Sequence, residues 1–186
     1  MKTTEHELLV IGAGPGGYRA ALNAADLGMD VACVDKEEMP GGVCLRVGCI
    51  PSKALIESSE WFDRAKRCFA DHGIATDDVQ LELETMMDRK VGIVRKLAHG
   101  IKSLFEQRDV ARYTGTARFQ EPGRIRLTNR DGEIELRAHK VLIATGSEPA
   151  PFPDFPNQSD RVGCSTEALE YSEVPKHLAV IGAGYI

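Results

Sequence analysis

The sequence lacks the features that would indicate a membrane, a secretion route or a nucleic-acid partner. No apolar run approaches the ~18–20 residues that a membrane span needs, and residues 1–7 are polar where a signal peptide would carry charged and apolar regions. No concentrated run of lysine and arginine occurs, and the formal net charge is -5 at pH 7, which argues against nucleic acid. We therefore expect a cytoplasmic protein that binds neither a membrane nor a nucleic acid.

Metal ligands at regular spacing are also scarce. Cys44 and Cys49 form one closely spaced pair, but the chain has no second pair of cysteine or histidine residues at the spacing that a four-ligand zinc site needs. We therefore expect no metal centre. The other three cysteines, Cys33, Cys68 and Cys164, stand singly in apolar or helical contexts, and we expect them to be inert thiols.

The composition is that of a globular protein. With 42% hydrophobic and 27% charged residues over 186 positions, the chain can bury one or two cores.

The cysteine pair leads directly into a helix-start signal, because Pro51 and Ser52 suit the first turn of a helix. Cys49 would then lie at the positive end of the helix dipole, where a thiolate is stabilised, and Lys53 would follow one turn later on the same face. A structural disulfide between Cys44 and Cys49 would close a very short loop and gain little entropic stabilisation. A zinc site, a structural disulfide and a redox-active disulfide remain open, and we favour the last.

A glycine-rich pattern near the N-terminus predicts a dinucleotide site. The apolar run 8–11 is typical of a strand buried in a parallel sheet, and it leads into G-x-G-x-x-G at residues 12–17. An Ala-rich helix over 18–27 follows, and a second strand over 31–34 ends at Asp35. The glycines would let the backbone approach a pyrophosphate, and the acid would bind a ribose hydroxyl. The alternative is a tight turn and a solvated carboxylate.

The rest of the chain predicts two long helices followed by short strands. Helices are expected from Pro51 to about Phe69 and from Glu84 to Gln107, the second with an apolar stripe for helix packing or subunit contact. After Asp109 the period changes to two, which predicts a β-meander of antiparallel strands over 110–114, 116–119, 125–127 and 134–136. A buried strand over 141–144 and another over 178–181 complete the predicted elements.

The segment Gly-Cys-Ile-Pro-Ser-Lys at 48–53, with Cys44 upstream, resembles the flavoprotein disulfide reductase family, and within it the dihydrolipoamide dehydrogenases. The resemblance covers nearly the whole chain. It implies an α/β, Rossmann-like FAD-binding fold with a parallel sheet, a long helix pair and a β-meander, with FAD at the first glycine pattern and NAD at the second. It also implies that Cys44 exchanges with substrate and that Cys49 packs against the flavin. The cofactor-binding residues implied by the pattern and the resemblance are Gly12, Gly14, Gly16, Gly17, Asp35, Lys36, Gly41, Gly42, Val43, Cys44, Lys53, Gly115, Ala117, Ala144, Thr145, Gly146, Ser147, Gly182 and Gly184.

The same resemblance predicts how the chain is divided. Residues 1–147 are expected to form the FAD-binding domain with the redox disulfide, 148–176 a Pro-rich connector, and 177–186 the start of a truncated NAD-binding domain. The strand and G-x-G at 178–184 repeat the opening of the first pattern before the sequence stops. We therefore expect an N-terminal piece of a longer protein that is inactive by itself.

The implied reaction passes electrons from a dihydrolipoyl dithiol through the cysteines and FAD to NAD. The implied partner is a lipoyl-bearing protein of a 2-oxoacid dehydrogenase or glycine cleavage complex, and the full-length protein is expected to be a homodimer. The alternatives are an NADPH-dependent disulfide or mercuric reductase and a non-catalytic FAD-binding module. Val43 replaces the family's usual threonine and Arg46 its usual asparagine, changes that we expect to shift cofactor affinity or redox potential without altering the chemistry.

Overall fold

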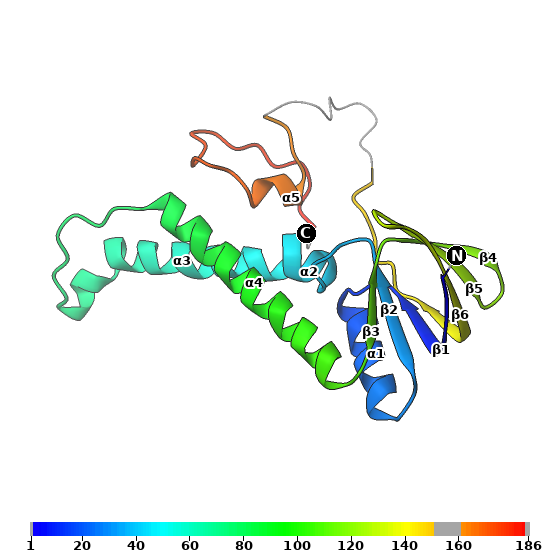
Figure 1. Cartoon of the computed structure of the whole chain (residues 1–186). Coiled ribbons are helices and arrows are strands. Elements are labelled where there is room, and N and C mark those ends of the chain that lie inside the picture. The colour runs from blue at the N-terminus through cyan, green and yellow to red at the C-terminus, as the bar shows by residue number, and fades with distance from the viewer. Residues whose placement is uncertain (1, 151–160, 185–186) are drawn as a thin grey trace. The chain divides into compact units, whose positions relative to one another are not determined.

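The structure, a computed structural model, describes residues 2–150 and 161–184 (Figure 1). The chain forms two compact units. The first consists of Met1–Arg46 and Arg95–Glu148, and the second of Val47–Val94 and Pro149–Ile186. The predicted boundaries after residues 147 and 176 stay a prediction. Pro151, Pro153 and Pro156 of the predicted connector, and the last two residues of the second glycine pattern, lie outside the described residues.

The first unit is built on one six-stranded sheet. Its central strand, β1 (Lys2–Ile11), pairs in parallel with β2 (Val31–Asp35) on one side and with β6 (Gly132–Ile143) on the other. The strand order is β3-β2-β1-β6-β5-β4, where β3 is Ala111–Thr114, β4 is Thr116–Glu121 and β5 is Arg124–Asn129. The predicted α/β class with a parallel sheet and a β-meander is confirmed.

Two strand predictions are wrong in detail. The segment 110–114 was expected in the meander, but β3 pairs in parallel with β2, from Ala32–Ala111 to Asp35–Thr114. Gly115, at φ 152°, separates β3 from β4. The strands expected at 134–136 and 141–144 are one continuous strand, β6, because it pairs with β1 from Ile134 to Ile143 while its first half also pairs with β5.

Helix α1 (Pro15–Asp26) packs against β1 and β2, and the chain turns away from it at Gly28, where φ is 84°. The first cysteine of the pair lies in a short helix, α2 (Gly42–Val47), which follows the second strand. The core of this unit is apolar and combines the parallel strands with the meander. Its fully buried members include Leu9, Val34 and Leu127.

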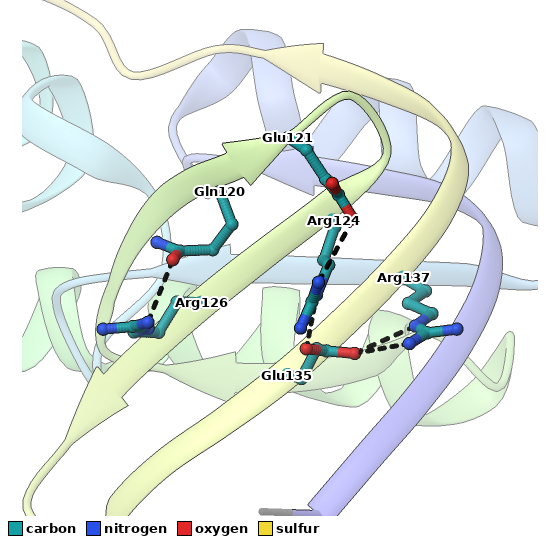
Figure 2. A network of polar contacts seen from close by, with 6 residues as sticks. All are labelled: Gln120, Glu121, Arg124, Arg126, Glu135 and Arg137. Carbon is teal, nitrogen blue, oxygen red and sulfur yellow. Dashed lines mark hydrogen bonds and ion pairs between the residues drawn. The ribbon is translucent and has the colours of Figure 1, made fainter.

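On the face of the meander opposite the apolar core, polar side chains form hydrogen bonds and ion pairs between the strands, as Figure 2 shows. The Glu135 carboxylate is 4% exposed, and it accepts hydrogen bonds from Arg124 Nε at 2.6 Å and from Arg137 Nε at 2.9 Å. Arg124 also donates to Glu121 at 3.2 Å. The hydrogen bond from Arg124 above all, with a further one from Arg137, holds the pKa of Glu135 below its usual range despite burial. Glu135 therefore joins β5 to β6 as a carboxylate.

The second unit contains α3 (Cys49–Arg67), the 3-10 turn η1 (Phe69–His72) and the beginning of α4 (Leu83–Gln107). Arg89 of α4 joins the two helices, because its guanidinium donates to the Ala54 carbonyl at 3.2 Å and to the Ser58 hydroxyl at 3.3 Å and pairs with Glu57. The predicted pair of long helices is confirmed. Along α4, the predicted apolar stripe is buried at Val94, Ala98, Ile101 and Phe105.

The last part of the second unit has little regular structure. Its helix α5 (Ser165–Ala168) is followed by a contact with α4, where the buried Lys90 ammonium donates to the Leu169 carbonyl at 2.7 Å and to Glu170 at 2.9 Å. The strand expected over 178–181 is wrong, because these residues form no strand and Val180 is 76% exposed. A strand needs hydrogen-bonded neighbours, and no described strand pairs with this segment. None of the helices in the described ranges combines the length and the apolar character that crossing a bilayer requires.

Candidate dinucleotide site

The candidate site follows from where the parallel strands end. Strands β1, β2, β3 and β6 run in the same direction, and their last residues are in register, with Ile11 beside Val34 and Ile143, and Asp35 beside Thr114. Ligands of open α/β sheets bind beyond these carboxyl ends. The predicted residues brought together at this edge are Gly12, Asp35, Lys36, Gly115, Ala144, Thr145, Gly146 and Ser147.

Two glycines of the first pattern are required by the fold itself. Gly12 has φ 106°, and a Cβ there would lie 2.2 Å from the Ala144 carbonyl oxygen. A Cβ at Gly17 would lie 1.8 Å from the Gly12 carbonyl oxygen. Only glycine lets the β1 loop, helix α1 and the end of β6 pack this closely.

Gly14 and Gly16 are not required in this way. The nearest atom to a Cβ at Gly14 would be Gly42 Cα, at an ordinary 3.7 Å, and a Cβ at Gly16 would meet nothing within 4 Å. The backbone at these two glycines therefore has room for a close neighbour. Such room fits a ligand whose phosphates approach the backbone closely.

Helix α1 begins at this loop. Gly14 is its N-cap and Pro15 its first residue, no described side chain caps it, and its first turn has no acidic residue. Its first N–H groups therefore lack intrahelical partners and carry the positive end of the helix dipole. This arrangement suits the pyrophosphate of a dinucleotide.

A second glycine loop is joined to the first. Gly41 and Gly42 have φ values of 115° and 62°, and a Cβ at Gly42 would lie 2.6 Å from Gly14 Cα. The Gly41 N–H donates to the Ala13 carbonyl at 2.8 Å. The start of α2, and with it Cys44, is thereby held against the first loop.

The Asp35 carboxylate has a role that the sequence did not suggest. It accepts hydrogen bonds from the Ala13 N–H at 2.6 Å and from the Glu37 N–H at 2.8 Å. Asp35 therefore fixes the glycine loop and the chain after β2 before any ligand is considered. The predicted contact between Asp35 and a ribose hydroxyl stays a prediction.

The two predicted catalytic cysteines lie in consecutive helices. Cys44 is half-buried in α2, and Cys49 is an exposed thiol at the first residue of α3. The helix therefore starts at the residue expected from the sequence, and Ser52 supports its first turn by donating through its N–H to the Gly48 carbonyl at 3.1 Å. The pairing of Cys44 with Cys49 stays a prediction.

Cys33 has the environment of an inert thiol. It is 2% exposed within β2. Burial, with a smaller contribution from the charge of Asp35, raises the pKa of Cys33 to about 12. Cys68 and Cys164 are exposed.

At the sheet edge, the Lys36 ammonium pairs with Glu148 at 3.3 Å on the surface. The other predicted cofactor residues are dispersed: Val43 is 54% exposed in α2, and Ala117 is half-buried in β4. Lys53 is exposed on α3, in the second unit with Gly182 and Gly184. Gly182 has φ 110°, close to the 106° of Gly12. Among residues 2–150 and 161–184, no group of three or more His, Cys, Asp and Glu side chains is arranged to hold a metal ion.

Two residues that contact this site were not among the predicted cofactor residues. Glu37 binds Asp35 through its N–H, and its carboxylate lies 3.4 Å from Arg46 Nη1. The sequence offered one signal for this ion pair. The acidic Glu37 and the basic Arg46 lie on either side of the second glycine loop. Charge alone does not predict such a pair, because the pair depends on where helix α2 places Arg46.

Comparison with known proteins agrees with this geometry. The family model described as pyridine nucleotide-disulphide oxidoreductase matches residues 6–186. The chain is 42% identical over 183 residues to the mitochondrial dihydrolipoyl dehydrogenase of Pisum sativum, covering 98% of this chain and 36% of that protein. It is 48% identical over 183 residues to dihydrolipoyl dehydrogenase 3 of Pseudomonas aeruginosa, covering 97% and 39%. The solved structure of the HOCl-induced flavoprotein disulfide reductase RclA from Escherichia coli matches with a TM-score of 0.78 and 26% identity, covering 97% of this chain and 37% of that one. The chain thus spans less than two fifths of the length of each of these relatives.

Proposed function

Because the chain belongs to the pyridine nucleotide-disulphide oxidoreductase family, we propose that it supplies the FAD-binding region and the redox-active cysteines of a dihydrolipoamide dehydrogenase. The observation that carries the proposal is the pair of joined glycine loops at the carboxyl edge of the parallel sheet, with Cys44 in the helix that starts from the second loop. Relatives named dihydrolipoyl dehydrogenase favour this reaction over an NADPH-dependent disulfide or mercuric reductase.

The residues at the sheet edge fit FAD. The backbone at Gly14 and Gly16 has room for a close neighbour, and the uncapped start of α1 suits the pyrophosphate. Asp35 and Lys36 lie where the ribose and the adenine side of a dinucleotide would be held, and the 144–147 segment follows β6 at the same edge. FAD, when bound, supplies the acceptor for two electrons.

The chemistry of this chain's own residues is thiol–disulfide exchange. A thiolate of the dihydrolipoyl dithiol attacks Cys44 Sγ of the Cys44–Cys49 disulfide, and Cys49 leaves as a thiolate. The second substrate thiolate then attacks the substrate sulfur of the mixed disulfide and releases the Cys44 thiolate. The substrate loses two electrons and two protons, and the protein disulfide gains the two electrons. Cys49 leaves at the N-terminal end of α3, where the helix dipole is positive.

The other parts of the proposal concern the whole protein. Electrons pass finally to NAD, which is supported by the similar positive φ of Gly182 and Gly12. The dithiol is carried by a lipoyl-bearing protein of a 2-oxoacid dehydrogenase or glycine cleavage complex, and two copies of the protein form a homodimer. The cytoplasmic location expected from the sequence stays a prediction, since relatives with mitochondrial in their names are among the matches.

The test uses the purified 186-residue chain. Titration with FAD, followed by flavin fluorescence, should give saturable binding, and dihydrolipoamide added without oxygen should expose two more thiols in the oxidised protein. The C44S and C49S variants should bind FAD and lose the dithiol-dependent change. No FAD binding by the wild-type chain would refute the cofactor assignment, and an unchanged thiol count would refute the disulfide.

A further inference from the structure

A closed ring of polar contacts joins the two glycine loops at the edge where the dinucleotide is proposed to bind, and Arg46 is its least satisfied member. From Ala13 the ring runs to the Asp35 carboxylate at 2.6 Å and on to the Glu37 N–H at 2.8 Å. The Glu37 carboxylate then meets Arg46 Nη1 at 3.4 Å. Helix α2 leads back from Arg46 to Gly41, whose N–H donates to the Ala13 carbonyl at 2.8 Å.

The Arg46 guanidinium is mostly buried but poorly paired. Its side chain is 22% exposed, and among the described residues its only ion pair is with Glu37, whose own side chain is 42% exposed. Its Nε–H is buried, with no hydrogen-bond partner among the described residues. A buried donor without an acceptor costs free energy, so the free protein holds this group in an unfavourable state.

The position of Arg46 makes a ligand the natural source of the missing acceptor. It lies one turn after Gly42, which is packed against Gly14 at the start of α1. Its partner Glu37 is fixed by Asp35, at the end of β2. Arg46 therefore connects the second glycine loop with the chain after β2, the two segments proposed to lie beside the pyrophosphate and the ribose of a dinucleotide.

We propose that Arg46 binds the phosphate–ribose part of the dinucleotide, with its guanidinium donating to an oxygen of that part once the ligand is present. The inference rests on the proposed function, because it takes FAD as the ligand of this edge. Arginine presents five donors in a rigid fork, so it keeps Glu37 on one side while it meets an anionic oxygen on another. Arg46 thereby sets how tightly the adenosine diphosphate half of the cofactor is held.

The experiment measures dissociation constants of wild type and R46M for FAD by flavin fluorescence, and for adenosine diphosphate by competition. We expect R46M to weaken both ligands by about 10–100-fold, the effect of losing a charge-assisted hydrogen bond. R46K keeps the charge without the fork and should fall between them. R126M is the matched control, because Arg126 also has a buried Nε–H without a partner but lies on β5 of the meander. It should bind both ligands as the wild type does.

A second series separates ligand binding from support of the loop. If Arg46 acted only by pairing with Glu37, E37Q would weaken FAD as much as R46M, and the double variant would lose nothing further. We expect E37Q to have the smaller effect. The proposal is overturned if R46M binds FAD like the wild type, if it weakens FAD but not adenosine diphosphate, or if E37Q reproduces its whole effect. Failure of the wild-type chain to bind FAD would instead refute the proposed function.

Discussion

Removal of the Asp35 carboxylate should destabilise the chain before any cofactor is added. In D35A the N–H groups of Ala13 and Glu37 lose acceptors at 2.6 and 2.8 Å. A hydrogen bond to a charged group contributes about 1.5–3 kcal/mol. Because Asp35 is half-buried, the lower value applies to each bond, so the free energy of unfolding should fall by about 3 kcal/mol in all.

The assay is urea denaturation of the cofactor-free chain. With a slope of about 1–3 kcal/mol per molar urea, the loss should move the midpoint down by about 1–3 M. D35N keeps one acceptor oxygen and should lose about half as much. D131A is the control, because Asp131 lies on an exposed turn between β5 and β6, far along the chain from the site. An unfolding midpoint of D35A equal to that of the wild type would refute the reasoning.

Three further predictions follow from other contacts. E135Q should lower the free energy of unfolding at neutral pH. The difference from wild type should shrink as the pH falls below about 4.3, because the lowered pKa of Glu135 stabilises the fold only while the carboxylate is charged. Urea denaturation at several pH values measures this difference, and a difference independent of pH would contradict the prediction. G17A should lower the melting temperature strongly, because its Cβ would clash with the Gly12 carbonyl oxygen, whereas G16A, whose Cβ meets nothing within 4 Å, should raise the melting temperature slightly by favouring α1. Differential scanning fluorimetry compares the two variants, and equal shifts would contradict the prediction. Iodoacetamide added at pH 8 after mild reduction should label the exposed Cys49 and leave Cys33 unmodified, since the Cys33 pKa of about 12 leaves almost no thiolate. Peptide mass spectrometry measures the labelling, and labelled Cys33 in the folded protein would contradict the prediction.

The sequence predicted the elements whose signals are local. The apolar run, the glycines and the Ala-rich helix lie within one short segment, and β1, α1 and β2 form there as expected. The long helices were visible because their apolar stripe repeats over many turns. Cys49 begins α3 as Pro51 and Ser52 indicated.

The strand pairings and hydrogen bonds that the sequence did not predict depend on residues distant in the chain. Alternation over 110–114 identifies a strand but does not distinguish an antiparallel neighbour from the parallel pairing with β2. Separate strands were predicted over 134–136 and 141–144, but β6 is continuous there because it pairs with β1 from Ile134 to Ile143. At the site, Asp35 was assigned from its place after β2, while its hydrogen bonds to Ala13 and Glu37 depend on how two loops pack.

The pairing of β1 with β6 has a consequence for how the protein is made. Lys2 of the first strand pairs with Ile134, so the middle of the sheet joins two segments that are synthesised more than 100 residues apart. The unit of β1, α1 and β2 can form early, but one side of β1 remains without its neighbour until β6 has emerged. Pairings over such distances close slowly and leave apolar strand edges exposed meanwhile. The emerging chain is therefore most vulnerable to aggregation, and most in need of a chaperone, while the helices α3 and α4 are being synthesised.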